Sequence, residues 1–532
     1  MRIPWIACSE SLPATRLCRV GTRRHTRGSC CKRLSRLRRC MADRARRMCH
    51  MLVADATVHA PWIADTASPE RQRARSAWLT NAALALLGIV YVELTRTGVH
   101  EFHHFVHGFS ESVFGQLMLY LGAIALVERS PTNRWTLPLI LLAAFAARLF
   151  AVAAPPFLSS DVYRYVWDGM VQAAGINPFR YIPADSHLGF LRDAAIYPSI
   201  NRREYAHTIY PPGAQFLFLL ITRVQASVPW MKLALVGLEG LTCWALMQCL
   251  ALLRLPRERV LLYAWHPVCI WEIGSSGHID AAALTAIALA LLARLRGRPL
   301  RAAGWLGAAA LIKLYPAALL PALVQRRLVA PALLFAALLV GGYLPYLSVG
   351  RGVLGFLPAY AREEGLDSGT RYFPLAWMQR TFHVSFAPTH YLAVCCIVLV
   401  ACAWWAFQQG RSATGAIQGG LVLATTMNLC FSPHYPWYFL WLLPFLTLWP
   451  WRPAFYLVLA VTYMLATRLG MPGEPLYRMN TFLYGGFVLL LVLDAAGSRL
   501  AALPGWRRLR DCLPPVAQHE PQSAASLQES SS

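Results

Sequence analysis

The sequence predicts an all-α integral membrane protein with about 11–14 transmembrane or re-entrant helices and long external loops. Three observations support this fold class. The 532 residues are 56% hydrophobic and only 14% charged, which is too apolar for a soluble protein of this size. The apolar residues form about fourteen separate segments of the length that a membrane helix needs. The arginines gather at the ends of these segments and in the two terminal regions.

Three regions with different compositions divide the chain. Residues 1–76 are rich in arginine and poor in acids, which predicts a basic, disordered N-terminal arm. Residues 77–500 hold the apolar segments and are predicted to form one polytopic membrane domain. Residues 501–532 include a polar stretch rich in Ser, Gln and Glu, which predicts a disordered cytoplasmic tail. The lipid bilayer is therefore the first partner expected for this chain.

The net charge of +24 raises the alternative of a nucleic-acid-binding protein. The arginines, however, lie at the ends of apolar segments and in the terminal regions rather than on one soluble basic face. Such a distribution is typical of residues that orient membrane helices. No nucleic-acid partner is expected.

The order of apolar segments and basic turns predicts which side of the membrane each loop faces. The N-terminal arm and the basic turn 128–134 are expected in the cytoplasm, which places the loop after the third segment outside. A multi-pass protein of the cell (inner) membrane follows. The segments lie near 78–95, 111–127, 136–154, 211–226, 231–253, 258–275, 278–295, 302–324, 328–348, 391–408, 414–431, 437–450, 453–468 and 481–498.

Two of these segments disturb a simple alternation. If the segment after Tyr210 crossed the membrane, the basic turn Arg254–Arg259 would lie outside, against the positive-inside rule. Segment 302–324 has basic residues at both ends but is too short for two crossings. Both segments are therefore expected to be broken or re-entrant. Non-crossing helices at membrane depth line protein cavities, so this irregularity indicates a site.

The stretch 155–181 follows an apolar segment yet is dense in acids and aromatic residues. Ser159 or Ser160 can cap a helix that Gly175 ends. On this helix Asp161, Tyr165 and Asp168 share one face. The two carboxylates can act as general base, metal ligand or clamp for an acceptor sugar. The alternative is an interfacial helix in which Arg164 pairs with Asp168, so Asp161 is the preferred catalytic residue.

Two further groups follow along the membrane domain. His278 and Asp280 begin an apolar segment after the helix-breaking run 274–277, where a helix N-terminus can bind an anion and His278 can relay a proton. The alternative is a polar turn capped by Asp280. Lys313 is one of only three lysines and lies within an apolar segment, where a charge costs about 2.5–3.5 kcal/mol. A phosphate or a carboxylate is the expected partner of Lys313.

Polar and aromatic residues also gather in the later outer loops. The run Ser432–Tyr438 contains His434 and Tyr438 between two prolines and is suited to stack a sugar ring or grip a prenyl chain. An aromatic belt at the membrane interface is the alternative. Arg371, in the loop 351–390, suits acceptor binding, and Arg478 is a cation that can meet a lipid phosphate.

Five motifs occur in an order that resembles the bacterial mannosyltransferase-like proteins of the C-type (GT-C) glycosyltransferase superfold. They are Ser160-Asp161-Val-Tyr-Arg-Tyr-Val-Trp-Asp168 running on to Asn177-Pro178, Tyr210-Pro-Pro, Gly277-His278-Ile-Asp280, Lys313-Leu-Tyr-Pro316 and Ser432-Pro-His-Tyr-Pro-Trp-Tyr438. The resemblance covers about residues 78–500, and the order of the motifs makes it specific. It implies a GT-C-like fold in the cell envelope.

The resemblance implies transfer of a hexose, often mannose, from a polyprenyl-phosphate carrier to a glycan or glycolipid acceptor on the extracytoplasmic face. Asp161 matches the acidic position of the family's first outer loop and is the expected base. One carboxylate without a covalent intermediate implies inversion at the anomeric carbon. A lipid phosphate is already an activated leaving group, so a base and phosphate-holding cations suffice for the chemistry.

The expected cofactors follow from the same residues. The fourteen cysteines match no zinc spacing, so no residue is assigned as a metal ligand. Relatives often carry a paired acidic motif where this chain has Ser159-Ser160 before Asp161, which leaves a divalent metal open. A nucleotide-sugar donor is disfavoured because no glycine-rich phosphate loop is present.

The competing functional class is a transporter or lipid flippase, although the sequence has no internal repeat. A polymerase or ligase acting on lipid-linked oligosaccharides shares the same chemistry.

Overall fold

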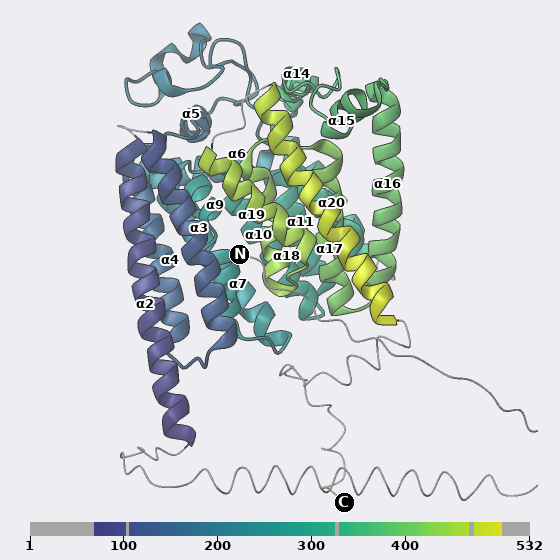
Figure 1. Cartoon of the computed structure of the whole chain (residues 1–532). Helices are drawn as coiled ribbons and strands as arrows, with labels where there is room; N and C mark the ends of the chain where they lie inside the picture. The colour runs from purple at the N-terminus through teal and green to yellow at the C-terminus, as the bar shows by residue number, and fades with distance from the viewer. Residues whose placement is uncertain (1–68, 103–105, 325–328, 468–472, 503–532) are drawn as a thin grey trace, which may run out of the picture. The chain divides into compact units, whose positions relative to one another are not determined.

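The computed structural model describes residues 69–102, 106–324, 329–467 and 473–502. Every regular element in these ranges is helical, and the long helices lie side by side as a bundle (Figure 1). The predicted all-α fold is confirmed. The first helix begins at Pro69, before the predicted end of the N-terminal arm at residue 76. The rest of that arm, and the tail beyond Ala502, lie outside the described residues.

Seven helical stretches in the described ranges are long and apolar enough to cross a membrane. Four shorter apolar helices accompany them. This total agrees with the predicted 11–14 transmembrane or re-entrant helices. The long stretches are Gln72–His100, Gly108–Arg129, Thr136–Ala153, Val228–Leu252, Val329–Glu363, Pro388–Gln409 and Glu474–Gly497, and the short ones are Pro212–Val224, Pro299–Ile312, Pro436–Leu448 and Arg452–Thr467.

The first half of the described chain contributes the helices from α2 to the π-helix η4. Helix α2 (Pro69–Phe102) packs against α3 (Val106–Arg129) and α4 (Thr136–Ala153). The elements that follow are α5 (Asp161–Ala173), the 3-10 helices η1 (Ser186–Leu191) and η2 (Tyr197–Ser199), α6 (Pro212–Val224), α7 (Val228–Leu252), η3 (Arg257–Val260), α8 (Leu261–Ala264), α9 (Pro267–Cys269) and the π-helix η4 (Ile270–Ser275).

The segment after Tyr210 forms α6, which does not cross the bundle. Its 13 residues span only about 20 Å, and it packs along α5 at the same end of the bundle (Figure 1). Pro212 begins α6, where the missing N–H of a first-turn proline costs nothing. Helix α7 therefore carries the chain away from α5, and the basic turn Arg254–Arg259 falls at the opposite end. This arrangement agrees with the broken or re-entrant segment expected from the sequence.

The segment around Lys313 enters and leaves the bundle at one end. Helix α10 (Asp280–Leu295) leads to α11 (Pro299–Ile312), and the chain returns through η5 (Tyr315–Leu319) and α12 (Leu320–Leu323). Arg294, just before this excursion, donates a hydrogen bond to the Gly410 carbonyl, and Ala322, near its end, also contacts Gly410. Both ends of this segment, at Arg294 and Ala322, thus lie beside the turn at Gly410, as expected for a re-entrant segment.

The second half of the chain completes the bundle. Helices α11 and α13 pack together, as do α16 with α17 and α19 with α20. The elements are α13 (Val329–Tyr343), η6 (Leu344–Leu354), α14 (Leu357–Glu363), α15 (Phe373–Phe382), α16 (Pro388–Gln409), α17 (Ala413–Phe431), η7 (Pro436–Leu442), α18 (Leu443–Leu448), α19 (Arg452–Thr467) and α20 (Glu474–Ala502).

A buried ion pair crosslinks α4 and α7 inside the bundle. The Arg148 guanidinium donates to both Glu239 carboxylate oxygens, with Nε 2.7 Å from Oε2 and Nη2 3.0 Å from Oε1. The Tyr263 hydroxyl adds a third donor to Glu239 at 3.1 Å. Both charged side chains are at most 1% exposed. This pair could not be recognised from the sequence, because Arg148 and Glu239 lie on separate segments whose composition is mainly apolar.

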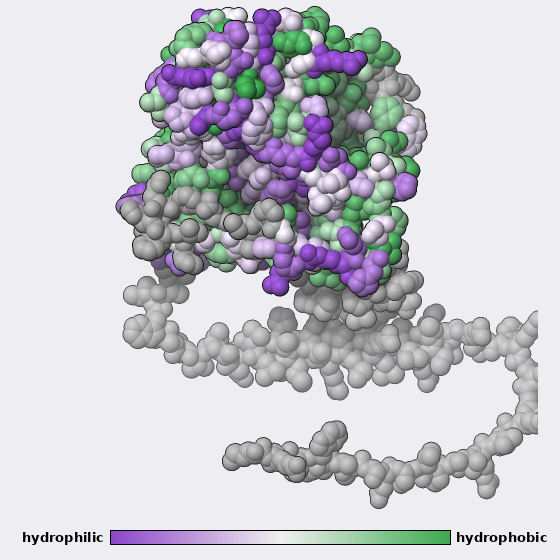
Figure 2. Space-filling model, turned by 90° about the horizontal axis from the view of Figure 1, so that it is seen from above, coloured by the Kyte–Doolittle hydropathy of each residue, from purple (hydrophilic) through white to green (hydrophobic). Residues whose placement is uncertain are grey.

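Helices α5, α14 and α15 lie at the same end of the bundle (Figure 1). Figure 2 views this end and shows hydrophilic residues over much of it. The loop between α5 and α6 and the loop between α13 and α16 both lie here (Figure 1). This end therefore holds the long loops that the sequence places on one side of the membrane.

Candidate functional site

A cavity of about 470 Å³ opens at the polar end of the bundle. Its wall combines the start of α5, the loop before α6, the re-entrant segment, α14 and the loop before η7. Charged, hydroxylated and aromatic side chains alternate around it. The lining residues are Leu158, Ser159, Ser160, Asp161, Arg164, Asn201, Arg202, Ala206, His207, Ile209, Tyr210, Pro211, Ile312, Lys313, Leu314, Tyr315, Phe356, Leu357, Tyr360, Glu364, Tyr435, Trp437 and Tyr438.

Asp161 presents its carboxylate to this cavity from the first turn of α5. The side chain keeps 25% of its surface exposed. Ser159 Oγ accepts the Asp161 N–H at 3.3 Å, which satisfies a free donor at the start of the helix. Asn201 donates to Asp161 Oδ1 at 2.7 Å, while Oδ2 lies 3.9 Å from His278 Nδ1. Asp161 is thus held in position at one oxygen and open to the cavity.

Lys313 lies on the cavity wall formed by the re-entrant segment. Its Nζ is 2.8 Å from Asp280 Oδ2, and the Tyr315 hydroxyl donates to Asp280 Oδ1 at 3.1 Å. The ammonium also lies 5.6 Å from the centre of the Tyr438 ring, within the range of a cation–π contact. Asp280 is fully buried and holds Lys313 from behind. The predicted carboxylate partner of Lys313 is therefore Asp280.

His278 lies beneath the cavity and is fully buried. Its ring stacks on Trp437, with ring centres 4.1 Å apart and planes inclined by 27°. Trp437 itself lines the cavity. The Trp437 ring therefore lies between the imidazole and the cavity, and the imidazole faces Asp161.

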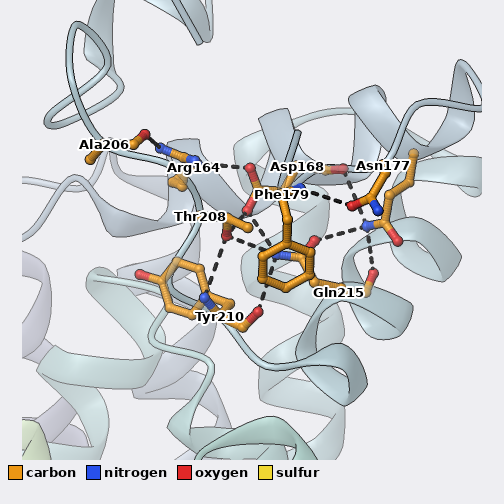
Figure 3. A network of polar contacts seen from close by, with 9 residues as sticks. Arg164, Asp168, Asn177, Phe179, Ala206, Thr208, Tyr210 and Gln215 are labelled. Atoms are coloured by element: carbon orange, nitrogen blue, oxygen red, sulfur yellow. Dashed lines mark hydrogen bonds and ion pairs between the residues drawn. The ribbon is translucent and has the colours of Figure 1, made fainter. Parts of the chain in front are cut away.

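Asp168 occupies a different environment from Asp161, although the sequence places both on one helix face. Arg164 Nε donates to Asp168 Oδ1 at 2.7 Å, and Thr208 and Gln215 donate to Oδ2 at 2.5 and 2.9 Å (Figure 3). Asp168 is 1% exposed and does not line the cavity. These contacts fasten α5 to the start of α6. The expected Arg164–Asp168 pair is confirmed, and the two acids are not displayed together at the surface.

A smaller cavity of about 190 Å³ adjoins the first and shares the walls Tyr315, Tyr360, Glu364 and Tyr438. Arg371 lines it and holds Glu364 Oε2 at 2.6 Å from its Nη1. Arg371 also contacts His434, whose Nε2 is 3.7 Å from the same Glu364 oxygen. The rest of this wall is mainly apolar and aromatic: Leu366, Met427, Asn428, Phe431, Pro433 and Trp441.

Besides Asp168, two further predicted site residues lie away from both cavities. Tyr165 is fully buried, stacks on Phe218 with ring centres 4.6 Å apart, and supports the wall residue Tyr210 from beneath. Arg478 has a side chain that is 78% exposed and pairs with Glu474 at 3.1 Å on the first turn of α20. Asp161, Lys313 and Tyr438 line the main cavity, whereas His278 and Asp280 lie directly behind its wall.

Several cavity residues come from loops that contain no recognisable sequence motif. Asn201 and Arg202 reach the cavity from the turn after η2, and Arg202 pairs there with Glu363 at 2.6 Å. His207 lines the same wall, and burial and the nearby Arg164 lower the pKa of its imidazole. No periodic pattern of apolar residues and no helix-breaking run marks these positions, so only the tertiary structure identifies them.

The cavity offers hydroxyl groups as well as charges. Tyr435 lines it, and burial together with the neighbouring Glu364 raises the pKa of the Tyr435 hydroxyl to about 12. The Tyr360 and Tyr438 hydroxyls contact one another at 3.2 Å. Protonated tyrosine hydroxyls and flat rings are suited to bind a polyhydroxylated sugar.

The described residues do not assemble a metal site. No group of three or more His, Cys, Asp and Glu side chains within them is placed to hold a metal ion. Asp161 contributes one carboxylate to the cavity, and Asp280 and Glu364 are each engaged by a cation. The residues present do not fit the divalent metal that the sequence leaves open.

A comparison with known families finds a match over part of the chain. Residues 71–328, just under half of the chain, match the family model described as alpha-(1->6)-mannopyranosyltransferase, N-terminal domain. The matched region contains Asp161, His278, Asp280 and Lys313. No curated protein matches the chain. On the family match the chain is a membrane glycosyltransferase, similar over residues 71–328 to the alpha-(1->6)-mannopyranosyltransferases.

Proposed function

We propose that the chain transfers mannose from a polyprenyl-phosphate carrier to a hydroxyl group of a glycan or glycolipid acceptor on the extracytoplasmic face. The observation that carries this proposal is the placement of Asp161 and Lys313 in one cavity. A carboxylate open to the cavity can accept the proton of the acceptor hydroxyl. A cation on another wall can hold the departing phosphate.

The proposed reaction inverts the anomeric carbon. The acceptor oxygen forms a bond to that carbon, while the bond to the phosphate oxygen breaks and its electron pair leaves with the phosphate. The acceptor proton passes to Asp161. Inversion converts a β-linked donor into an α-linked product, in keeping with the linkage in the description of the matching family. Transporter function is a weaker proposal, because the match is to a transferase.

The orientation of the bundle supports an extracytoplasmic site. Asp161 and the cavity lie at the end that carries α5, whereas the basic turn Arg254–Arg259 lies at the other end. Basic turns between membrane helices are retained in the cytoplasm. A polyprenyl-phosphate donor suits a site at this depth, because its chain stays in the bilayer while its sugar enters the cavity.

Labelled polyprenyl-phosphate mannose tests the proposal directly. The purified chain, given this donor and octyl α-mannoside as acceptor probe, is expected to form a labelled dimannoside whose new bond is α-linked. Nuclear magnetic resonance of the product reports the anomer. Product formation from a nucleotide-linked mannose, with none from the lipid-linked donor, would overturn the donor assignment.

Lys313→Gln is expected to raise the KM for the lipid-linked donor about 10- to 100-fold. The reason is that a hydrogen bond to a charged group contributes about 1.5–3 kcal/mol and the substitution removes the phosphate-holding cation. Steady-state kinetics with the same donor and acceptor probe measure the change. Lys313→Arg keeps the charge and is expected to retain most of the donor affinity.

A double variant separates binding from stability. Lys313→Gln leaves Asp280 buried without its cation, so the single variant also loses stability. Lys313→Gln combined with Asp280→Asn removes both charges and is expected to recover stability while the donor KM stays high. A donor KM that returns to the wild-type value in the double variant would show that Lys313 does not hold the phosphate.

A further inference from the structure

Glu272 is a buried acid that the proposed reaction does not yet use. It lies in the π-helix η4 and is 1% exposed. His278 Nε2 lies 3.2 Å from Glu272 Oε2. Within the described residues, Glu272 Oε2 and both ring nitrogens of His278 are buried without a hydrogen-bond partner. A buried carboxyl group is costly unless it is compensated, so its placement against a single imidazole needs a physical reason.

The backbone brings Glu272 and His278 together in a way that an α-helix does not. Residues six positions apart on an α-helix point in different directions. Here the π-helix ends in a turn in which the His278 N–H donates to the Glu272 carbonyl at 3.0 Å. Gly277 has φ +72°, and a Cβ at this position would lie 2.9 Å from Lys232 Cγ. Single π-helical turns are rare and frequently occur at functional sites.

The His278 imidazole lies between two carboxylates. Nε2 faces Glu272 at 3.2 Å, and Nδ1 faces Asp161 Oδ2 at 3.9 Å. The stacked Trp437 ring fixes the plane of the imidazole and separates it from the cavity. One acid is therefore open to substrate, whereas the other is sealed inside the protein.

The other charged groups near His278 are already engaged. The Lys232 ammonium, on α7, donates to the Ala151 and Ala154 carbonyls at 2.9 and 2.7 Å. Asp280, two residues along the chain, is held by Lys313. Glu272 and Asp161 thus remain as the carboxylates that face the imidazole itself.

We infer that Glu272 is a positioning residue that, through His278, makes Asp161 a stronger base. This inference rests on the proposed role of Asp161. Glu272 Oε2 and His278 Nε2 lie 3.2 Å apart and neither has a hydrogen-bond partner, so a small rotation of the imidazole lets Glu272 accept the Nε2 hydrogen of neutral His278 and leaves the Nδ1 lone pair facing Asp161. The same logic, in which a buried acid fixes the tautomer of a histidine and stabilises its charged form, operates in catalytic triads.

The proton balance of the step is complete. As the acceptor oxygen bonds to the anomeric carbon, its proton moves to Asp161 Oδ2 and is then shared with His278 Nδ1. The resulting imidazolium lies against Glu272, so the positive charge is compensated. After the product leaves, the proton returns through Asp161 to water in the cavity, and His278 is neutral again.

Glu272→Gln tests the inference because glutamine keeps the shape of the side chain without its charge. We expect kcat to fall about 10- to 100-fold with little change in the KM of either substrate. The pH profile of kcat is expected to differ from that of the wild type in its acidic limb, because the substitution removes one of the two carboxylates that face the imidazole. Mannosyl transfer to octyl α-mannoside in detergent, measured across pH, gives both quantities.

Three companion variants make the result decisive. Ser276→Ala, in the same buried turn, is the matched control and is expected to keep the wild-type profile. Glu272→Asp keeps the charge and is expected to retain the wild-type acidic limb, and it replaces the Gln variant if that fails to fold. Adding Glu272→Gln to His278→Asn is expected to cause no further loss of kcat, because both act in one relay.

The outcomes distinguish this inference from the proposed function. A Glu272→Gln enzyme whose pH profile is that of the wild type would overturn the relay. If Asp161→Asn is inactive in the same assay, the proposed function stands without the relay. If Asp161→Asn is fully active, both fail together.

Discussion

Asp161→Asn is expected to lower kcat for mannosyl transfer by about 10²–10⁴-fold, the contribution typical of a general base. The amide keeps the size of the side chain and can still accept the Asn201 hydrogen bond to Oδ1. It cannot take up the proton of the acceptor hydroxyl. Transfer from labelled polyprenyl-phosphate mannose to octyl α-mannoside, followed over a time course, measures the loss.

A matched acid at the same end of the bundle controls this experiment. Asp193→Asn changes an acid that accepts backbone N–H groups in its own loop and does not line the cavity. It is expected to keep nearly all activity. Asp161→Ala is expected to be as inactive as Asp161→Asn, with the protein still present in the membrane. Undiminished transfer by either Asp161 variant would remove the catalytic assignment.

Arg148→Met is expected to destabilise the bundle by about 3–5 kcal/mol, since it leaves a buried carboxylate without its cation. Arg148 and Glu239 are at most 1% exposed, so water cannot screen the isolated charge. Arg148 also donates to the Ala144 and Ala264 carbonyls at 3.0 and 2.8 Å, and these bonds are lost as well. A thermal unfolding midpoint measured in detergent is expected to fall accordingly.

The double variant Arg148→Met, Glu239→Gln tests the reason for that loss. Both charges are removed, and the glutamine oxygen can still accept the Tyr263 hydroxyl. Most of the stability is expected to return, because a buried ion pair contributes little compared with neutral side chains of similar volume. Arg96→Met, in an exposed pair with Glu93, should leave the midpoint almost unchanged. A single Arg148→Met variant as stable as the wild type would contradict the account.

The two cavities are lined by different kinds of side chain, which suggests that each has a separate role in the proposed reaction. The larger cavity holds Asp161 and Lys313, the groups that the chemistry requires. The smaller one is lined mainly by aromatic and apolar side chains, and Arg371 and Glu364 are paired beside it. Glu364 and Tyr438 belong to both walls, so a ligand in one cavity contacts side chains that also shape the other.

The membrane fold could be predicted from the sequence because the energy of placing a segment in a bilayer is largely a sum over its own residues. Long apolar segments and arginine-rich turns follow directly from that sum. The failure of strict alternation at Tyr210 and Lys313 was also visible in the sequence, and the structure places short helices at both positions. Asp161 and Lys313 were recognisable because a charge beside or within an apolar segment is expensive.

The pairing of side chains across helices could be decided only by the tertiary structure. The spacing of Asp161 and Asp168 is compatible with one shared site, yet Arg164, Thr208 and Gln215 bury Asp168 while Asn201 leaves Asp161 open. Asn201 and Thr208 come from a loop whose course no local pattern specifies, and Gln215 lies on the helix that follows this loop. The location of Arg478, outside the lining of either cavity, was undetermined for the same reason.

The sequence alone thus determined the class of protein, the irregular segments and the acid that faces the cavity. The structure decided which groups surround that acid. Helix crossings join Arg148 to Glu239, and a π-helical turn joins Glu272 to His278. Hydropathy is a local property that a linear sequence displays directly. Contacts between distant segments depend on helix packing and on backbone turns, and these are fixed only when the whole chain folds.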